Sequence, residues 1–191
     1  MEVHNKTKTV YVVLSNTGAL TAKILHRFTK AEYNHSSISV KEDLSVMYSF
    51  GRRWKYWALC GGYVKESIRW GLLSRFPETK IVVMPFAVTQ EQYTAISKHL
   101  EEMHVLRKKY NYDWIGLFLA PFRKKIKRRH HYYCSEFVRE MLVNFGLAKE
   151  EDFPYITTPN DFLRLYGDKK IYEGKLCDFA SIEEDEEKEV I

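Results

Sequence analysis

One of the three cysteines of the chain lies where the sequence predicts the start of a helix. The apolar residues after Cys134 share one helical face, which a glycine ends: Val138, Met141, Leu142, Phe145 and Gly146. The free N–H groups and the partial positive charge of a helix N-terminus stabilise a thiolate, the nucleophilic form of cysteine. Cys134 is therefore the candidate nucleophile. Cys60 is not followed by a helix pattern, and Cys177 lies near the tail that we expect to be disordered. The odd number and wide spacing of the cysteines argue against a disulfide framework or a zinc ribbon.

A thiolate nucleophile needs a base that pairs with it as imidazolium and later protonates the leaving group. Six of the seven histidines lie in a polar terminus, on predicted helices or beside a basic run: His4, His26, His99, His104, His130 and His131. His35 instead begins a predicted strand, and the residues that follow, Ser36, Ser37 and Ser39, are small enough to leave room for a cleft. His35 is therefore the candidate base. Taken alone, a strand histidine or a free cysteine is more often a structural residue, so the pair needs further support.

Two other chemistries fit the sequence less well. His130, His131 and Cys134 are three potential metal ligands, but adjacent histidines on an extended chain point in different directions and no fourth ligand follows at a zinc-like interval. The G-x-S-x-G elbow of many serine hydrolases does not occur. We therefore expect neither a metal nor another cofactor.

The elements that must position Cys134 and His35 are a mixture of strands and helices. Apolar and β-branched runs predict strands at 9–14, 33–40, 45–50, 81–86 and 170–176, and helical spacing predicts helices at 19–28, 89–109, 134–146 and 158–166. Thr89 and Gln92 have the spacing of a capping box, and Pro85 places its strand at an edge or a strand end. Residues 51–62 have no clear period and are predicted to be irregular. Because strands and helices do not alternate regularly, the sequence predicts an α+β fold with helices against an antiparallel sheet.

The size and composition of the chain fit one domain. Its 191 residues, 45% hydrophobic and 15% aromatic, fill one sizeable core, and no linker or repeat divides them. We expect a single domain over 1–180, followed by an acidic, disordered tail over 181–191. No stretch reaches the ~18 apolar residues of a membrane span and no signal peptide is visible, so the predicted location is cytoplasmic.

The net charge of +5 is unevenly distributed along the chain. The tail carries −5 and the rest +10, much of it in one run: Arg123, Lys124, Lys125, Lys127, Arg128 and Arg129. Such a run is usually a solvated loop, because like charges repel one another. It also offers contact to an anionic partner such as a membrane surface, although we expect no specific nucleic-acid recognition.

Three segments in a fixed order carry a family resemblance: Tyr33-Asn34-His35-Ser36-Ser37-Ile38, Tyr110-Asn111-Tyr112-Asp113-Trp114-Ile115-Gly116 and Tyr133-Cys134-Ser135-Glu136-Phe137-Val138. Together they resemble the circularly permuted NlpC-like cysteine hydrolases of the papain fold, which include YiiX-like proteins and, more distantly, lecithin retinol acyltransferase. Unpermuted relatives place a D-C-S-G motif before the histidine, whereas permuted ones place the histidine first and a C-S-E motif near the C-terminus. The resemblance covers about residues 10–166 and includes Thr158-Pro159-Asn160-Asp161 after the cysteine helix.

The resemblance implies a role for the matching residues, with Cys134 as nucleophile and His35 as general base. Such families add a third polar residue on the strand after the histidine, which orients the imidazole. By strand parity this position is Met47 or Ser49, of which only Ser49 forms hydrogen bonds, and Glu42 near the turn is a second candidate. Serine does not offset the positive charge of an imidazolium, so weak or specialised activity is expected.

Two further residues have both a catalytic and a structural interpretation. An oxyanion hole would use the backbone N–H of Cys134 and a second donor, for which Tyr112 is the candidate, against plain core packing. Glu136 points either to a cleft or to solvent, and its place in the first helical turn favours a structural role.

The activity implied is thiol-dependent hydrolysis or transfer at an amide or ester, of the peptidase, amidase or acyltransferase kind, through an acyl-enzyme on Cys134. The expected substrate is a small acylated or peptide molecule; its identity and the oligomeric state stay open. The alternative is a catalytically weak or inert module on the same fold that binds a ligand, a membrane or a partner. Its support is the lack of a His or Glu in the third position, together with the basic run. An unrelated α+β protein with an accidental motif match is a third interpretation.

Overall fold

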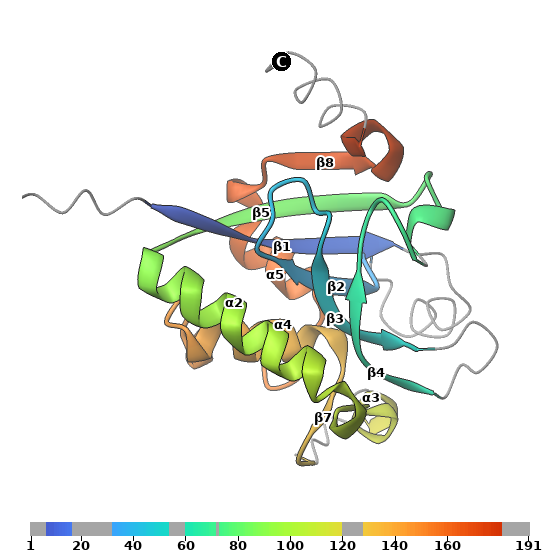
Figure 1. Ribbon diagram of the computed structural model, residues 1–191, viewed down its shortest axis with the longest axis vertical. Helices are drawn as coiled ribbons and strands as arrows, with labels where there is room; N and C mark the ends of the chain where they lie inside the picture. The colour runs from blue at the N-terminus through green and yellow to red at the C-terminus, as the bar shows by residue number, and fades with distance from the viewer. Residues whose placement is uncertain (1–6, 17–31, 54–59, 72, 120–127, 181–191) are drawn as a thin grey trace, which may run out of the picture.

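The computed structural model describes residues 7–16, 32–53, 60–71, 73–119 and 128–180, which form a mixed α and β structure around one eight-stranded sheet (Figure 1). The strands are β1 (Lys8–Asn16), β2 (His35–Ser39), β3 (Met47–Arg52), β4 (Gly61–Glu66), β5 (Lys80–Val88), β6 (Asn111–Tyr112), β7 (His131–Tyr132) and β8 (Tyr172–Lys175). Their order in the sheet is β7-β6-β4-β3-β2-β1-β5-β8. Neighbouring strands are antiparallel except for the parallel pair β6 and β7, so the predicted α+β class with an antiparallel sheet is confirmed.

The helices agree with the sequence prediction in most places. They are α2 (Gln90–Val105), α3 (Trp114–Leu119), α4 (Cys134–Asn144) and α5 (Pro159–Tyr166), with 3-10 turns η1 (Leu73–Arg75), η2 (Arg107–Lys109), η4 (Glu150–Asp152) and η5 (Gly167–Lys169). The predicted capping box at the start of α2 is present, because Thr89 and Gln92 exchange hydrogen bonds of 2.9 and 3.1 Å. The predicted end at residue 109 is reached through η2 rather than by α-helix. The helix predicted at 19–28 lies outside the described residues.

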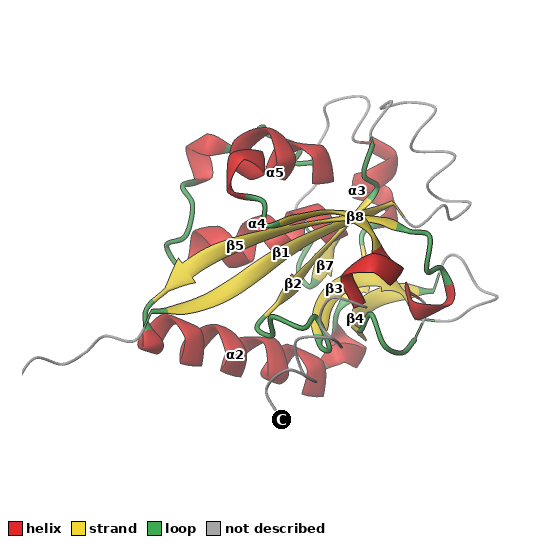
Figure 2. Ribbon diagram, turned by 90° about the horizontal axis from the view of Figure 1, so that it is seen from above, coloured by secondary structure: helices red, strands yellow, loops and turns green. Residues whose placement is uncertain are grey.

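The two faces of the sheet have separate cores, because successive side chains of a strand point to opposite sides. Val10, Val12 and Leu14 of β1 belong to one core, whereas Tyr11 and Val13 belong to the other. The first, which we call the helical face, packs against residues of α2, α4 and α5: Ile96, Leu100, Met103, Phe137, Val138, Met141, Leu142 and Phe162. Figure 2 shows α4 and α5 along one side of β1 and β5.

The opposite face, which we call the serine face, carries small polar residues on its central strands. Ser37 and Ser39 alternate with Ile38 of the helical face, and Ser49 lies between Tyr48 and Phe50 of that face. Its own apolar core is smaller and includes Leu44, Met47, Ile68, Leu73, Ile81, Val83, Leu176 and Phe179. On this face, short polar side chains of β2 and β3 therefore take the place that large apolar side chains have on the helical face.

An aromatic cluster on the helical face fixes α4 against β3 and β4. The ring centroids of Phe50 and Phe137 are 5.3 Å apart, and both lie 5.5 Å from the ring of Tyr63. Each of these side chains is almost completely buried. Aromatic residues of this size dominate core energetics, so the cluster supplies much of the packing between α4 and the strands β3 and β4.

The sequence prediction was wrong at two strands. β5, which contains Pro85, is not the edge strand, since it lies between β1 and β8. However, β8 pairs only with Lys80–Val83, so no strand needs the missing N–H of Pro85 on that side. The region 51–62, predicted to be irregular, contains the end of β3 and the start of β4. β6, β7 and α3 were also not predicted.

The described residues do not test the predicted tail or the predicted domain boundary. The acidic tail at 181–191 lies outside the described residues, and its disorder stays a prediction, as does the single domain over 1–180. Across the described ranges, the helices are too short or too polar to cross a membrane.

Candidate active site

Cys134 occupies the first turn of α4, as the sequence predicts. Tyr133 before it has extended backbone angles (φ −96°, ψ 164°), and α4 begins at Cys134 itself. The helix ends near Gly146, whose φ of +71° belongs to the left-handed region that favours glycine. The Ser135 hydroxyl donates a hydrogen bond of 2.8 Å to the carbonyl oxygen of Thr157 and ties the first turn of the helix to a later loop. The sulfur of Cys134 is thereby held at the positive end of the helix.

His35 begins β2, and its ring meets the sulfur of Cys134. Its Cα pairs with Ser15 of β1, and its ring is close enough to Cys134 for each group to shift the pKa of the other through charge and hydrogen bonding. The other contact of the ring is Nε2, which lies 3.0 Å from Oε2 of Glu66. Since Nε2 is engaged by Glu66, Nδ1 is the ring nitrogen left for Cys134. The two residues that the sequence proposes as nucleophile and base are therefore brought together across almost a hundred positions of the chain.

Glu66, at the end of β4, is the third member of the site and was missed by the sequence analysis. Its Oε2 also accepts a hydrogen bond of 3.0 Å from the Ser37 hydroxyl, so the carboxylate is held by two residues of β2. The side chains of His35 and Glu66 are 15% and 19% exposed, so the pair keeps some contact with solvent. A carboxylate offsets the charge of an imidazolium, which the predicted serine does not.

Ser49 and Glu42 do not take the third position. The Ser49 hydroxyl donates a hydrogen bond of 2.7 Å to the carbonyl oxygen of Ser36, so it supports the backbone beside His35 rather than its ring. Glu42 is exposed in the turn between β2 and β3. The orienting residue lies one strand further along the sheet than expected. Residues 63–66, Tyr-Val-Lys-Glu, do not alternate between apolar and polar types and follow two glycines, so no strand was predicted there.

The Glu66 carboxylate reverses the effect of burial on the His35 ring. Burial alone would lower the pKa of His35, but the charge of Glu66 and hydrogen bonds to Cys134 and Glu66 outweigh it and raise that pKa well above 6.5. Burial would likewise raise the pKa of Glu66, yet the His35 charge and hydrogen bonds from His35 and Ser37 lower it below 4.5. The pair is therefore an imidazolium beside a carboxylate at neutral pH.

The surroundings of Cys134 favour its thiolate. Burial raises the pKa of a thiol, but hydrogen bonding and the charge of His35, together with hydrogen bonding from Ser36, lower the pKa of Cys134 below its ordinary value. The Ser36 hydroxyl oxygen is buried and makes no hydrogen bond of normal geometry within the described part of the chain. Cys134 is only 5% exposed, yet its neighbours are polar, and it belongs to neither apolar core.

Tyr112 is also at the sulfur. Burial and then the charge and hydrogen bond of Cys134 raise the pKa of Tyr112 well above 10.0, so its hydroxyl is a donor toward the thiolate. Gly61 of β4 permits this position, because a Cβ there would lie 2.6 Å from the Cβ of Tyr112. The centroid of the Tyr112 ring also lies 4.4 Å from that of Trp114, with the two rings tilted, and Tyr112 packs against the core of the helical face. The two interpretations from sequence, oxyanion donor and core residue, thus apply to the same side chain.

His130 and His131 lie away from this arrangement. Nε2 of His131 lies 2.9 Å from a guanidinium nitrogen of Arg128, and its Nδ1 lies 2.8 Å from the carbonyl oxygen of Arg129. Both border a cavity of about 350 Å³ lined by Arg128, Arg129, His130, His131, Tyr132, Glu136 and Glu140. Glu136 is buried and lines this cavity instead of pointing freely to solvent. No group of three or more potential metal ligands occurs among the residues that the structure describes.

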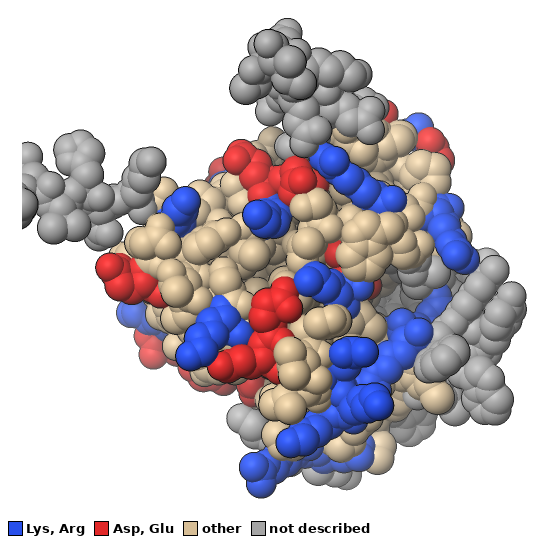
Figure 3. Space-filling model, viewed as in Figure 1, with Lys and Arg blue, Asp and Glu red and all other residues tan. Residues whose placement is uncertain are grey.

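The basic run is only partly described. Residues 120–127 lie outside the described ranges; Arg128 pairs with the buried Asp113 at 3.4 Å, and Arg129 is exposed. A second group of basic residues, η2 (Arg107–Lys109), follows α2 and is exposed. Figure 3 shows Lys and Arg side chains gathered at the lower right of the view, near the end of α2 and β4.

Comparison of the chain with family models, with curated proteins and with solved structures gives no match. The function of the chain is therefore inferred from the geometry and chemistry of His35, Glu66, Cys134 and Tyr112.

Proposed function

We propose that the chain is a thiol-dependent hydrolase or acyltransferase that acts on an amide or ester bond. The observation that carries the proposal is the position of the His35 ring, which lies 3.0 Å from the carboxylate of Glu66 and close enough to Cys134 for the two groups to shift each other's pKa. This is the arrangement of nucleophile, base and orienting group that covalent acyl transfer requires. A sulfur on a helix N-terminus adds the thiolate stabilisation that a cysteine nucleophile needs.

The first half of the reaction forms an acyl-enzyme. The Cys134 thiolate attacks the carbonyl carbon of the substrate, and an S–C bond forms while the carbonyl oxygen takes up negative charge. The backbone N–H of Cys134 and the Tyr112 hydroxyl are the donors available to that oxygen. The bond to the leaving amine or alcohol then breaks, and the leaving group takes the proton of the His35 imidazolium.

The second half releases the acyl group. Neutral His35 accepts a proton from water or from an acceptor amine as its oxygen or nitrogen attacks the thioester carbon. The C–S bond breaks, and the thiolate of Cys134 and the imidazolium of His35 are restored. Throughout, Glu66 keeps the ring oriented and offsets its positive charge, as the buried carboxylate of a catalytic triad does. Small acylated or peptide molecules are the proposed substrates.

The finer fold assignment belongs to the same proposal. A histidine on an early strand, a carboxylate on a later strand and a cysteine on a following helix fit the permuted papain-like order that the motifs resemble. The alternative of a catalytically inert binding module was based in part on the lack of a carboxylate in the third position. Because Glu66 lies beside His35, that argument no longer holds, and only the basic surface still supports the binding-module alternative.

Alkylation with iodoacetamide tests the proposal without knowledge of the substrate. The full chain is treated at about pH 6 to 7, where an ordinary thiol with a pKa near 8.5 is mostly protonated, and each cysteine is followed by peptide mass spectrometry. Cys60 and Cys177 are internal controls; burial and then nearby acidic groups raise the pKa of Cys177 above 9.0. The proposal predicts that Cys134 reacts faster than both despite its burial. Equal or slower labelling of Cys134 would remove the case for an activated nucleophile.

A further inference from the structure

The loop before α5 contacts both halves of the proposed site, which lie on different elements. Thr157 and Asn160 are three residues apart, and one meets the cysteine helix while the other meets the segment before the histidine strand. The capping box of α5 makes this loop rigid: the Asp161 carboxylate accepts hydrogen bonds of 2.8 and 2.7 Å from the backbone N–H and the hydroxyl of Thr158. We call residues 157–161 the α5 entry segment.

The contact with the histidine side is a hydrogen bond to the backbone. Oδ1 of Asn160 accepts the N–H of Tyr33, two residues before His35, at 3.2 Å. Tyr33 is completely buried, and its hydroxyl donates to Oε1 of Glu173 at 3.2 Å. Burial and the charge of Glu173 raise the pKa of Tyr33 to about 12, so this hydroxyl stays a donor at neutral pH. Tyr33 is therefore fixed at both its backbone and its ring.

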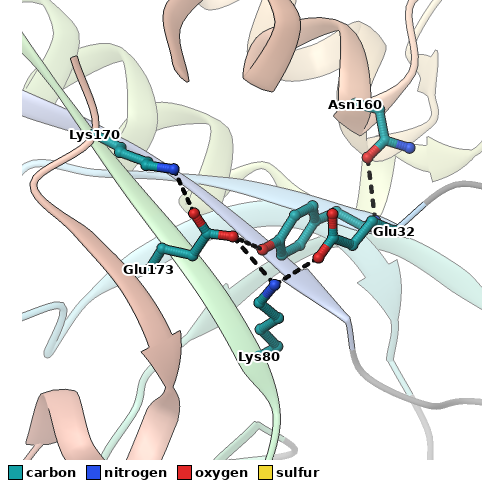
Figure 4. A network of polar contacts seen from close by, with 6 residues as sticks. Glu32, Lys80, Asn160, Lys170 and Glu173 are labelled. Carbon is teal, nitrogen blue, oxygen red and sulfur yellow. Dashed lines mark hydrogen bonds and ion pairs between the residues drawn. The ribbon is translucent and has the colours of Figure 1, made fainter. Parts of the chain in front are cut away.

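An ion-pair network fixes Glu173, which accepts the hydrogen bond from the Tyr33 hydroxyl. Glu173 of β8 lies between Lys80 and Lys170, at 3.1 and 2.5 Å, and Lys80 also reaches Glu32 at 2.5 Å, as Figure 4 shows. Hydrogen bonds from Lys170 and Lys80 lower the pKa of Glu173 to about 2. The lysines are partly exposed, so the network is screened by solvent and adds orientation more than stability.

The contact with the cysteine side is buried. The Ser135 hydroxyl donates to the carbonyl oxygen of Thr157 at 2.8 Å, and both residues are almost inaccessible. Ser135 directly follows Cys134, as Tyr33 closely precedes His35. The α5 entry segment is thus bonded within one residue of the nucleophile and within two residues of the base.

We propose that the α5 entry segment is a positioning element for the site, in which Asn160 and the Thr157 carbonyl together set the distance between the sulfur of Cys134 and the ring of His35. This inference rests on the proposed function. An interaction between a thiolate and an imidazolium depends steeply on separation, and misplacement by ~1 Å costs up to ~10²-fold in rate. Neither Asn160 nor Thr157 touches the reacting atoms, so both act through Tyr33 and Ser135.

The test is the pH dependence of Cys134 alkylation in the full chain, measured for the wild type, Asn160→Ala and Asn160→Asp. Asn160→Ala removes the acceptor; we expect the apparent pKa of Cys134 to rise by about one unit, so that the alkylation rate falls about tenfold at pH values below the wild-type pKa of this thiol. Asn160→Asp keeps an acceptor oxygen at the same place and should follow the wild-type profile. Thermal melting of each variant is recorded alongside, because a merely structural residue lowers the melting temperature and leaves the pH profile unmoved.

A double-variant comparison tests whether the contact of Asn160 with Tyr33 and the contact of Ser135 with Thr157 act together. Ser135→Ala alone is expected to slow Cys134 alkylation about as much as Asn160→Ala, and the double variant little more than either, because breaking one contact already releases the pair. If the fold-change in the double variant equals the product of the two single fold-changes, the two contacts act independently, and their joint positioning role is overturned. If Asn160→Ala does not fold, Asn160→Ser is used in its place. The serine side chain is too short to reach the Tyr33 N–H, so the same change in the pH dependence of Cys134 alkylation is expected.

The outcomes separate this inference from the proposed function. An ordinary thiol pKa for Cys134 in the wild type refutes the function itself. A lowered pKa in the wild type that is equally low in Asn160→Ala, or a loss in Asn160→Asp as large as in Asn160→Ala, leaves the function standing and overturns the positioning role.

Discussion

The helical face and the serine face of the sheet are built for different purposes. On the helical face large side chains such as Phe50, Tyr63 and Phe137 are in mutual contact and almost completely buried. On the serine face the same strands carry Ser37 and Ser49, and polar hydrogen bonds replace apolar contacts. One strand thus supplies packing on one side and a polar site on the other, as the two-residue period of a strand permits.

The difference indicates where substitutions should cost stability and where they should cost chemistry. Removing a large side chain from the helical face leaves a cavity, whereas removing a polar group near His35 changes charge and orientation with little loss of packing. The site itself lies where the two regions meet, since α4 packs on the helical face and brings Cys134 to His35. Predictions for four substitutions follow from this contrast.

The largest effect is expected at the nucleophile. Cys134→Ala removes the thiolate and should lower hydrolysis of an activated ester or amide by at least about 10⁴-fold, as removal of a catalytic nucleophile does. The fold should be retained, because alanine is smaller and the sulfur belongs to neither core. Activity and thermal melting measured on the same sample check both statements. Residual activity near that of the wild type would assign the reaction to another group.

The next effect concerns stability on the helical face. Phe50→Ala removes a completely buried ring that contacts Tyr63, Tyr132 and Phe137, and the free energy of unfolding should fall by about 3–5 kcal/mol. Urea denaturation measures this loss. The pH dependence of Cys134 alkylation in the fraction that remains folded should keep its wild-type shape. A shifted profile would show that the two faces are not separable.

Glu66→Gln should affect the chemistry more than the fold. The neutral amide keeps the shape of the side chain but no longer raises the pKa of His35, and the rate should fall about 10²-fold, at the lower end of what a general base contributes. Because the pKa of His35 falls and that of Cys134 rises, the pH window in which imidazolium and thiolate coexist should narrow from both sides. A pH profile of kcat/KM for the wild type and Glu66→Gln checks this. If the pH range of kcat/KM is the same in Glu66→Gln as in the wild type, Glu66 is not part of the catalytic site.

The same ion pair makes stability depend on pH with a definite sign. Glu66, whose folded-state pKa lies below 4.5, contributes stability above that pH and loses it as the pH falls through the folded-state value. His35, whose folded-state pKa lies above 6.5, contributes fully below 6.5 and loses its contribution as the pH rises through the raised value. The stabilisation by the pair should therefore be greatest between these limits and absent from Glu66→Gln.

The smallest effect is expected at Ser49, which the sequence proposed for the third position. Ser49→Ala removes a hydrogen bond to the Ser36 carbonyl and should lower the free energy of unfolding by about 1 kcal/mol. Its pH profile should match that of the wild type, in contrast to Glu66→Gln. If the pH range of kcat/KM is narrower in Ser49→Ala than in the wild type, Ser49 does act on the His35 ring.

The parts of the site that follow local rules were predictable from sequence. The helix that begins at Cys134 is marked by its apolar stripe and Gly146, and the start of β2 by the small residues after His35. Glu66 was not predictable by the same means, because its strand begins with two glycines and pairs non-locally with β3. Its contact with His35 depends on the order of strands in the sheet, which the sequence pattern does not specify.

Two further features needed the tertiary structure for a similar reason. Pro85 lies in an internal strand because β8 is short, and the length of β8 is a property of pairing rather than of local propensity. Tyr112 reaches the sulfur because Gly61 has no side chain, a condition that joins two segments fifty positions apart. Local composition indicates which residues can do chemistry; non-local pairing determines which of them meet.

The central claim, that Cys134 is a thiolate paired with the His35 imidazolium at neutral pH, is tested most directly by titrating the ultraviolet absorbance of the thiolate. The difference between the titration curves of the wild type and of Cys134→Ala isolates this one sulfur from Cys60 and Cys177. The ion pair predicts that the difference is already present at about pH 6 and disappears only in acid, well below the ordinary thiol pKa near 8.5. A difference that develops only above about pH 8 would contradict the ion pair and the proposed function with it.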